Sequence, residues 1–416
     1  MQIPKLSLPP LMSSYKKDIS AISCIFLCML CVYAIVWSYT GFWPWTGNIY
    51  NSFSLQSARW LQGHLDLGQD YPWLELAIYH GRYFVSFPPF PSYVMLPFSL
   101  FFGANTPDGW IALCISFLGA FYTYRLFRHF DRSEESATFW TLFIMVGSNL
   151  LYITVNGWVW FLAQNLCFAL SVMALYYALC AKGGLSLAFW ACSVGCRPMN
   201  ALYAPVLLIL LYKKIKEQHP DLTFKEILLP RLHWAIAPCI IAASYMLLNY
   251  LRFDSVLEFG HNYLPEFTRV ETGQFHLDYM KNNLPSLFRL PTVSDNRTLQ
   301  FPSWDGMAFY LATPIFVSYF IEAIVAICKR KKGHLLLSVL IPCTVVVHFL
   351  LLTAHKTMGG HHFGNRYTLD ALPYILVAML LLMNDNEETE KFHYPLAMLG
   401  IALNIVGTIS SYNLTI

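Results

Sequence analysis

The residues best suited to chemistry in this chain are three carboxylates in one short stretch. Asp66, Asp70 and Glu75 alternate there with histidine and aromatic side chains, namely His64, Tyr71, Trp73, Tyr79 and His80. A carboxylate in such a setting can take the proton of a sugar hydroxyl or hold a divalent cation. The alternative is that these three residues only keep a loop in contact with water.

Two other segments place basic side chains in apolar surroundings. Arg197 stands in GCRPMNAL between two apolar runs, and an ionisable residue at a membrane edge usually faces a polar cavity or a partner. The segment TMGGHHFGNRYTLDALP groups His361, His362, Arg366 and Asp370. An arginine there can pair with phosphate oxygens through two N–H groups. The alternatives are an arginine that extends to the membrane surface and a polar turn in which Asp370 caps the next helix.

The elements that must position these residues are long apolar runs. The 416 residues are 56% hydrophobic and 12% charged, whereas soluble proteins carry about 25% charged residues. The sequence therefore predicts an all-α fold, a polytopic transmembrane helical bundle of about 11 spans in a single domain over residues 1–416. The candidate spans are residues 19–40, 108–127, 136–155, 158–180, 184–197, 199–212, 232–250, 307–328, 334–354, 370–384 and 394–412.

The net charge and the cysteines exclude several other classes of protein. A net charge of +3 gives no reason to expect a nucleic-acid partner. The 11 cysteines fall within apolar runs, where we expect them to pack as small hydrophobic side chains. Their spacing with histidine matches no zinc motif. We therefore expect no metal site built from cysteine.

The basic residues predict the orientation of the chain. Segment 88–103 is apolar, but it is short and carries four prolines. If it does not cross the membrane, 17 of the 27 Lys and Arg residues fall on one side, including Lys5, Arg125, Arg128, Arg132 and the run 329–332. By the positive-inside rule this side is the cytoplasm. We expect a multi-pass protein of the plasma or inner membrane with a cytoplasmic N-terminus, and 88–103 as a re-entrant or juxtamembrane segment.

This topology places three segments on the external face: a first loop over 41–107, a second over 251–306 and a short one over 355–370. In the first loop, the spacing predicts a short amphipathic helix over residues 50–61 that lies on the membrane surface. Its apolar face would hold Phe53, Ser57, Trp60 and Leu61, and its polar face Ser52, Gln56, Arg59 and Gln62. We expect the three segments to form one polar chamber at the membrane edge.

The order of these motifs resembles the GT-C superfamily of polytopic glycosyltransferases. It is similar to the bacterial branch related to dolichyl-phosphate-mannose–protein mannosyltransferases and aminoarabinose transferases. The resemblance covers nearly the whole chain and rests on LAIYHGRYFVSFPPFPSYVMLPF, SVGCRPMNAL, LNYLRFDSVLEFGHNY and GGHHFGNRYTLDALPYIL, in that order.

The resemblance implies transfer of a sugar from a polyprenyl-phosphate donor to a lipid, glycan or protein acceptor at the external face. It makes Glu75 the base, with Asp66 and Asp70 as its neighbours. It also implies a set of side chains near the donor phosphate, namely His80, Arg82, Arg197, His361, His362 and Arg366. A divalent cation often assists in this family, but these residues form no metal-ligand pattern.

The sequence departs from the family at two places where relatives often carry an acidic residue. The first external loop begins with Asn48 and Asn51, and the second external turn contains Asn156. An amide cannot take a proton at neutral pH. Glu75 or a neighbour is then the base, or the chain is an inactive partner subunit. A third alternative is a secondary transporter or lipid-handling protein, which usually shows repeats and charges in mid-membrane; neither is evident here.

Overall fold

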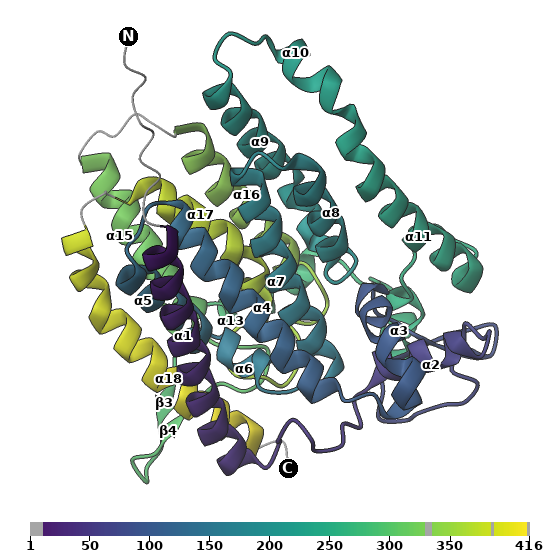
Figure 1. Cartoon of the computed structure of the whole chain (residues 1–416). Helices are drawn as coiled ribbons and strands as arrows, with labels where there is room; N and C mark the ends of the chain where they lie inside the picture. Colours follow the sequence, from purple (N-terminus) through teal and green to yellow (C-terminus); the bar gives the residue numbers. More distant parts are fainter. Residues whose placement is uncertain (1–10, 329–334, 384–386, 414–416) are drawn as a thin grey trace, which may run out of the picture.

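The protein is a bundle of helices, as the sequence predicts (Figure 1). The structure, a computed structural model, describes residues 11–328, 335–383 and 387–413. Lys5 and the basic run 329–332 lie outside these residues. The longer bundle helices are α1 (Leu11–Thr40), α4 (Asp108–His129), α5 (Glu134–Val146), α7 (Val159–Leu179), α8 (Gly183–Val194), α9 (Ala204–Gln218), α11 (Ile236–Phe253), α15 (Ile315–Cys328), α16 (Leu335–Thr353), α17 (Leu372–Leu382) and α18 (Tyr394–Asn413).

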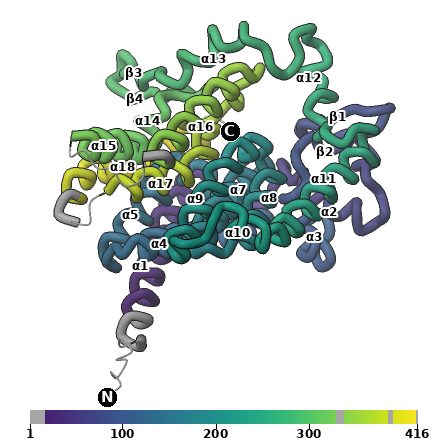
Figure 2. The backbone as a smooth tube through the Cα atoms, turned by 90° about the horizontal axis from the view of Figure 1, so that it is seen from above, coloured from purple at the N-terminus to yellow at the C-terminus, as the bar shows by residue number. Residues whose placement is uncertain are grey.

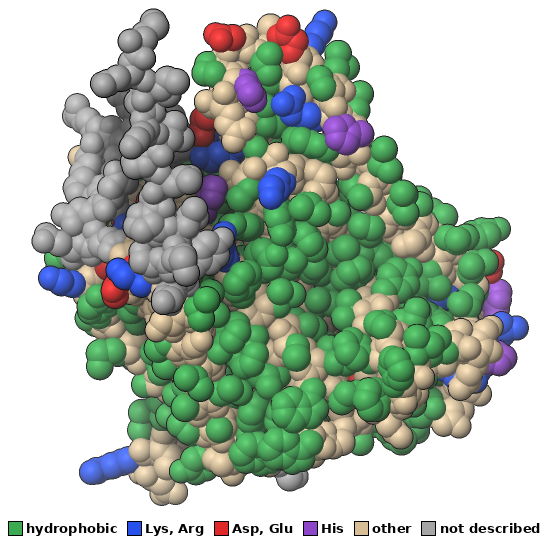
Figure 3. Space-filling model, viewed as in Figure 1, with side chains coloured by type: hydrophobic (Ala, Val, Ile, Leu, Met, Phe, Trp, Pro, Cys, Tyr) green, Lys and Arg blue, Asp and Glu red, His purple; other side chains and the backbone are tan. Residues whose placement is uncertain are grey.

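Five helical stretches in the described part of the chain are long and apolar enough to cross a membrane. They are Lys17–Thr40, Asp108–His129, Val159–Leu179, Phe224–Phe253 and Glu390–Asn413. Shorter apolar helices cover Gly183–Val194, Ile315–Cys328 and Leu337–Thr353. Figure 3 shows a broad hydrophobic face, with charged side chains gathered mainly above it and along its right edge. Lipid is the solvent that suits such a surface.

The predicted span 136–155 is not one helix. The chain leaves α5 after Val146 and resumes in the short α6 (Leu150–Thr154). Between them, the Asn149 side chain donates a hydrogen bond to the carbonyl of Phe363 at 3.0 Å. Because the helix is interrupted here, the Asn149 side chain can bond the backbone of the segment 355–370.

Helix α7 is the centre of the bundle and is buried along most of its length. It packs against α4, where Gly119 faces Phe168 so closely that an added Cβ would lie 3.3 Å from the ring. Two amides of α7 are buried as well. Asn165 bonds the carbonyl of Ala112 on α4, at 2.9 Å, and Gln164 reaches the segment 355–370. The central helix thus supports one of the three predicted external segments directly.

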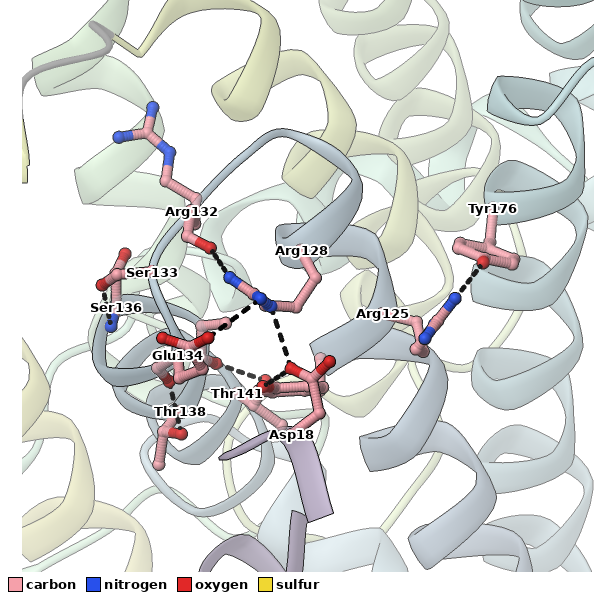
Figure 4. Close-up of polar contacts among 12 residues, drawn as sticks. Asp18, Arg125, Arg128, Arg132, Ser133, Glu134, Ser136, Thr138, Thr141 and Tyr176 are labelled. Atoms are coloured by element: carbon pink, nitrogen blue, oxygen red, sulfur yellow. Dashed lines mark hydrogen bonds and ion pairs between the residues drawn. The ribbon is translucent and has the colours of Figure 1, made fainter. Parts of the chain in front are cut away.

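A polar network ties helices together at the end of the bundle where the described chain begins (Figure 4). Arg128 of α4 bonds Asp18 of α1 at 3.0 Å and Glu134 of α5 at 3.1 Å. Arg125 donates to the Tyr176 hydroxyl of α7 at 3.0 Å. These arginines belong to the cluster that we predict to be cytoplasmic.

The three predicted external segments lie together at the opposite end of the bundle. The first contains α2 (Ser52–Leu61), the hairpin of β1 (Leu76–Tyr79) and β2 (Arg82–Val85), and α3 (Phe90–Phe102), all beside the lower end of α11 (Figure 1). The second contains α12 (Pro265–Thr268), α13 (Met280–Ser286) and the two-residue strands β3 (Thr292–Val293) and β4 (Leu299–Gln300). It runs along one edge of the molecule (Figure 2). Backbone bridges join it to the third segment at Phe275–His355 and Trp304–His361.

Helices α2 and α3 pack with their polar side chains inside. Ser57 and Ser99 share a hydrogen bond of 2.5 Å, and Ser92 donates to Gln56 at 2.7 Å. The expected polar face of α2 is therefore wrong at Ser52 and Gln56, which are fully buried instead of facing water. The outer side of α3 is apolar, and Phe101 at its end is 83% exposed. Ser92 of α3 explains the burial of Gln56, because the spacing within α2 alone cannot reveal this partner.

Candidate functional site

The three segments enclose one cavity of about 750 Å³, which we call the loop cavity. Its polar lining comes from Glu75 of the first segment, from Glu258, His261 and Glu266 of the second, and from His355, His361 and Arg366 of the third, with Arg197 beside them. Its walls are largely aromatic and include Tyr50, Phe87, Trp158, Trp160, Phe161, Phe259, Phe267, Phe275, Trp304 and Tyr367. The loop cavity thus joins residues that are up to 317 positions apart in the sequence, from Tyr50 to Tyr367.

Glu75 is placed by the hairpin that follows it. The turn at His80 and Gly81 has φ angles of 49° and 73°, which suit a two-residue hairpin connection. The register pairs Leu76 with Val85, and the Ser86 hydroxyl donates to the Glu75 carbonyl at 3.0 Å. The backbone of Glu75 is therefore fixed at the base of the hairpin, and its carboxylate points into the loop cavity.

The surroundings of Glu75 raise its pKa above the ordinary value. The side chain is open to the loop cavity, yet enough protein surrounds it that desolvation is the largest cause. The charge of Glu266 acts in the same direction, while the nearby polar N–H of Trp160 and the charge of Arg366 oppose it. A carboxylate with a raised pKa is a stronger base, which suits removal of a hydroxyl proton.

Arg197 is held by a buried carboxylate. Its Nε donates to Asp370 at 2.9 Å, and the Asp370 side chain is 1% exposed. Gln164 donates to the other oxygen of Asp370 at 2.8 Å. Burial is the largest single effect and lowers the pKa of Arg197, but the charge of Asp370, the neighbouring Tyr367 and the hydrogen bond to Asp370 together outweigh it, so the pKa is raised. Arg197 is thus a permanent, oriented cation at the cavity wall.

Removing this partner should destabilise the protein. Asp370→Asn leaves the Arg197 charge largely buried without its carboxylate, which costs on the order of 3 kcal/mol. We expect the apparent melting temperature in detergent to fall by several degrees, measured by tryptophan fluorescence. Glu217→Gln breaks the exposed ion pair with Lys214 and should leave the melting temperature nearly unchanged. Equal melting temperatures for the two variants would contradict this assignment.

Arg366 is buried at the cavity wall with part of its donor capacity unused. The residue is 4% exposed, and its Nε and Nη1 have no hydrogen-bond partner in the described part of the chain. Nη2 makes only long bonds, to the Gly359 carbonyl at 3.4 Å and the Tyr367 hydroxyl at 3.5 Å. The guanidinium stacks on the rings of Tyr367 and Phe161, at 4.5 and 5.8 Å. A buried cation without a carboxylate is costly unless an anion approaches it.

Gly359 allows this approach. Its φ of +105° suits glycine, and an added Cβ would lie 3.1 Å from Nη2 of Arg366.

His361 also lines the loop cavity, whereas His362 is fully buried and is not part of the lining. Burial and then the charge of Arg366 lower the pKa of His362 to about 3. His362 is therefore neutral and lies beneath the surface of the loop cavity.

The structure separates Asp66, His80 and Arg82 from Glu75. These three residues line a second cavity of about 420 Å³, which we call the hairpin cavity, together with Gly63, His64, Leu65, Tyr79, Phe84, Leu251, Arg252 and Asp254. Asp66 lies 3.5 Å from Arg59 and 4.0 Å from Arg82. Asp70 is exposed and lines neither cavity. Only Glu75 of the three predicted carboxylates therefore faces Arg366.

Asn48 and Asn156, two of the three amides where the resemblance implies an acidic residue, are occupied by structural bonds. Asn48 donates to the Asp108 carboxylate at 3.0 Å and to the Gly157 carbonyl at 2.9 Å. Asn156 donates to the Tyr412 hydroxyl at 2.6 Å. Gly157 packs so closely on Asp108 that an added Cβ would lie 2.5 Å from its backbone. These residues lock the two external turns together and do not line the loop cavity.

Of the titratable residues of the loop cavity, the sequence indicated Glu258 and His261 as polar residues of the second external segment without giving them a role, and it did not indicate Glu266 or His355. The first two belong to LRFDSVLEFGHNY directly after a span, which was a usable signal. Glu266 and His355 stand in stretches without any motif. In the described part of the chain, no group of three or more His, Cys, Asp or Glu side chains can hold a metal ion.

No protein-family model matches this chain, and no curated protein matches its sequence. Its structure is similar to that of the oligosaccharyltransferase from Archaeoglobus fulgidus in the apo form, with a TM-score of 0.55 and 11% identity over 95% of this chain and 56% of that one. It is also similar to ArnT from Cupriavidus metallidurans bound to undecaprenyl phosphate, with a TM-score of 0.50 and 11% identity over 93% of this chain and 73% of that one. The chain spans little more than half the length of the oligosaccharyltransferase. Its fold is GT-C-like.

Proposed function

We propose that this protein is a membrane glycosyltransferase that moves a sugar from a polyprenyl-phosphate donor to an acceptor at the external face. The observation that carries the proposal is the pairing, in one cavity, of a carboxylate of raised pKa with a buried arginine whose donors lack partners. The first supplies a base and the second an anion site. The GT-C-like fold and the undecaprenyl phosphate bound to ArnT support a polyprenyl phosphate as that anion.

In the proposed reaction, the acceptor hydroxyl attacks the anomeric carbon of the sugar. The bond from that carbon to the phosphate oxygen breaks, and its electron pair leaves with the polyprenyl phosphate. The hydroxyl proton passes to the Glu75 carboxylate. A single displacement of this kind inverts the configuration at the anomeric carbon.

Arg366 and Arg197 would act on the leaving group. Negative charge grows on the phosphate as the glycosidic bond breaks, and fixed cations in a site with little water stabilise it more than water does. Arg366 contributes its positive charge and the weakly bonded Nη2, since its Nε and Nη1 are covered by protein, and Arg197 is already oriented by Asp370. The aromatic walls supply flat apolar surfaces for the sugar ring.

The membrane would hold the rest of the donor. The apolar outer side of α3 and the spans beside it leave the polyprenyl chain in lipid while its head enters the loop cavity. We infer the same topology as from the sequence: a cytoplasmic N-terminus, with residues 41–107, 251–306 and 355–370 outside. Asp66, His80 and Arg82 then belong to a separate polar surface and not to the donor phosphate site.

An inactive partner subunit is the second candidate, because Asn48 and Asn156 stand where relatives often carry acids. Proteoliposomes with a panel of radiolabelled undecaprenyl-phosphate sugars separate the alternatives. We expect the label to leave the polyprenyl phosphate and to become covalently bound to an acceptor in a membrane extract. Binding of the donor without any transfer would favour the partner subunit, and delivery of free labelled solute into the vesicles would favour a transporter. Either result would overturn the proposal.

A further inference from the structure

His261 presents an unused hydrogen-bond acceptor to the loop cavity. It begins the 3-10 turn His261–Tyr263 after α11, and its Nδ1 lies 2.7 Å from the carbonyl oxygen of Ser86. A carbonyl oxygen can only accept, so Nδ1 carries the hydrogen. In the neutral ring the second nitrogen, Nε2, then keeps its lone pair.

Two effects keep this ring neutral. Burial lowers the pKa of His261 below its ordinary value, and the charge of Arg197 lowers it further. The bond to Ser86 opposes them without reversing the direction. Phe87, Phe267 and His355 surround the ring, and the cavity also holds Glu258 and Glu266.

The neighbouring imidazole shows what a satisfied ring looks like. Nδ1 of His355 donates to the Thr357 carbonyl at 2.8 Å, and its Nε2 lies 3.2 Å from the amide nitrogen of Gln274, from which it accepts. Nε2 of His261 receives no such bond from any described residue, although the atom is not sealed off from the cavity. An acceptor in this position is suited to a donor supplied by a ligand.

We propose that Nε2 of His261 accepts a hydrogen bond from a substrate hydroxyl in the loop cavity. This inference rests on the proposed function and deepens it by naming a subsite for a polyhydroxylated group. The hydroxyl belongs either to the donor sugar or to the acceptor. His261 is then a binding residue of the second external segment, in the same cavity as the arginines that would hold the phosphate.

Three substitutions separate the two nitrogens of the ring. His261→Asn keeps an N–H near the Ser86 carbonyl but removes the acceptor at Nε2. His261→Gln places an amide oxygen near Nε2, and His261→Ala removes both. We expect Asn and Ala to raise one KM by about 3- to 10-fold, as the loss of an ordinary hydrogen bond does, and Gln to restore most of it. His276→Asn, an exposed residue of the same segment that lines neither cavity, is the matched control.

The two Michaelis constants identify the source of the hydroxyl. A rise in the KM of the labelled undecaprenyl-phosphate sugar assigns the subsite to the donor, and a rise in the KM of the acceptor assigns it to the acceptor. Unchanged values for His261→Asn, or a Gln variant as poor as Ala, would overturn the hydroxyl subsite alone. Absence of transfer by the wild-type protein would instead overturn the function on which it rests.

A second measurement compares the pH dependence of KM in the wild-type protein and in His261→Gln. Protonation turns Nε2 into a donor, so the affected KM should rise as the pH falls through a value below 6.5, the ordinary pKa of histidine. His355 lines the same cavity, and burial lowers its pKa to about 4, so its protonation would also affect KM at low pH. The same profile in His261→Gln would therefore assign the pH dependence to another group and contradict the proposal.

Discussion

Glu75→Gln should lower the rate of sugar transfer by about 10²- to 10⁴-fold, the usual contribution of a positioned base. Glutamine has nearly the same shape, so the hairpin that fixes the backbone at position 75 is retained, but its amide cannot take a proton. We expect the loss in kcat and little change in the KM of the donor. The measurement is the initial rate of label transfer in proteoliposomes.

The controls for this variant test the cavity itself. Asp70→Asn changes an exposed carboxylate outside both cavities and should retain wild-type activity. Asp66→Asn alters only the hairpin cavity, so its effect should be small beside that of Glu75→Gln. Full activity of Glu75→Gln, or an equal loss in Asp66→Asn, would refute the assignment of the base to Glu75.

The pH dependence follows from the direction of the Glu75 shift. Only the ionised carboxylate accepts a proton, so kcat should fall as the pH decreases through the pKa of Glu75 in the substrate complex. Desolvation and Glu266 raise that pKa above its ordinary value of 4.5. The acidic limb of the profile should therefore lie above pH 4.5. In Glu266→Gln one raising charge is lost, and the limb should move to lower pH; a limb that moves upward would contradict the electrostatic picture.

Arg366→Ala should reduce kcat by about 10²- to 10³-fold, as the loss of one preorganised charge at a developing anion does. It should also weaken binding of undecaprenyl phosphate, the leaving group itself, measured by native mass spectrometry in detergent. Arg366→Lys keeps the charge but loses the planar pair of donors, so we expect only partial recovery.

The matched control for Arg366 is Arg269→Ala, an exposed arginine of the second segment that lines neither cavity. Its removal tests whether a general loss of positive charge is enough to weaken binding. Undecaprenyl phosphate bound equally well by Arg366→Ala and the wild-type protein would show that the anion site lies elsewhere. A monodisperse elution profile for each variant excludes misfolding as the cause.

Hydropathy was sufficient to predict the helical bundle, because a helix that lies in lipid must be apolar over a long stretch of sequence. It could not predict the break after Val146, since Asn149 bonds a loop more than 200 positions away. The strands β1 and β2 were also missed. Each has four residues, too few for an alternating pattern to stand out. The sequence showed that α3 is largely apolar, but it did not show that Ser92 and Ser99 form hydrogen bonds with α2.

Within the site, proximity along the chain was the misleading signal. His80 and Arg82 are within seven positions of Glu75, yet they lie at the far end of the hairpin. A strand rises about 3.3 Å per residue, so the four residues of β1 carry the chain roughly 13 Å away from the base. Arg197 and Arg366, distant in sequence, reach the same cavity because α7 and Asp370 hold the third segment.

The inverted packing of α2 and α3 has a consequence for how this protein must be handled. Phe53 of α2 and Met95 of α3 share an apolar cluster with Leu76 and Val85 at the base of the hairpin, so the pair is the floor beneath Glu75. The serine hydroxyls of α2 and α3 face each other, and the apolar side chains of α3 face outward. This arrangement is stable only where lipid or detergent covers the outer side. Removal of lipid should therefore displace Glu75 and abolish transfer activity before the helical bundle unfolds. Adding lipid back should restore the activity.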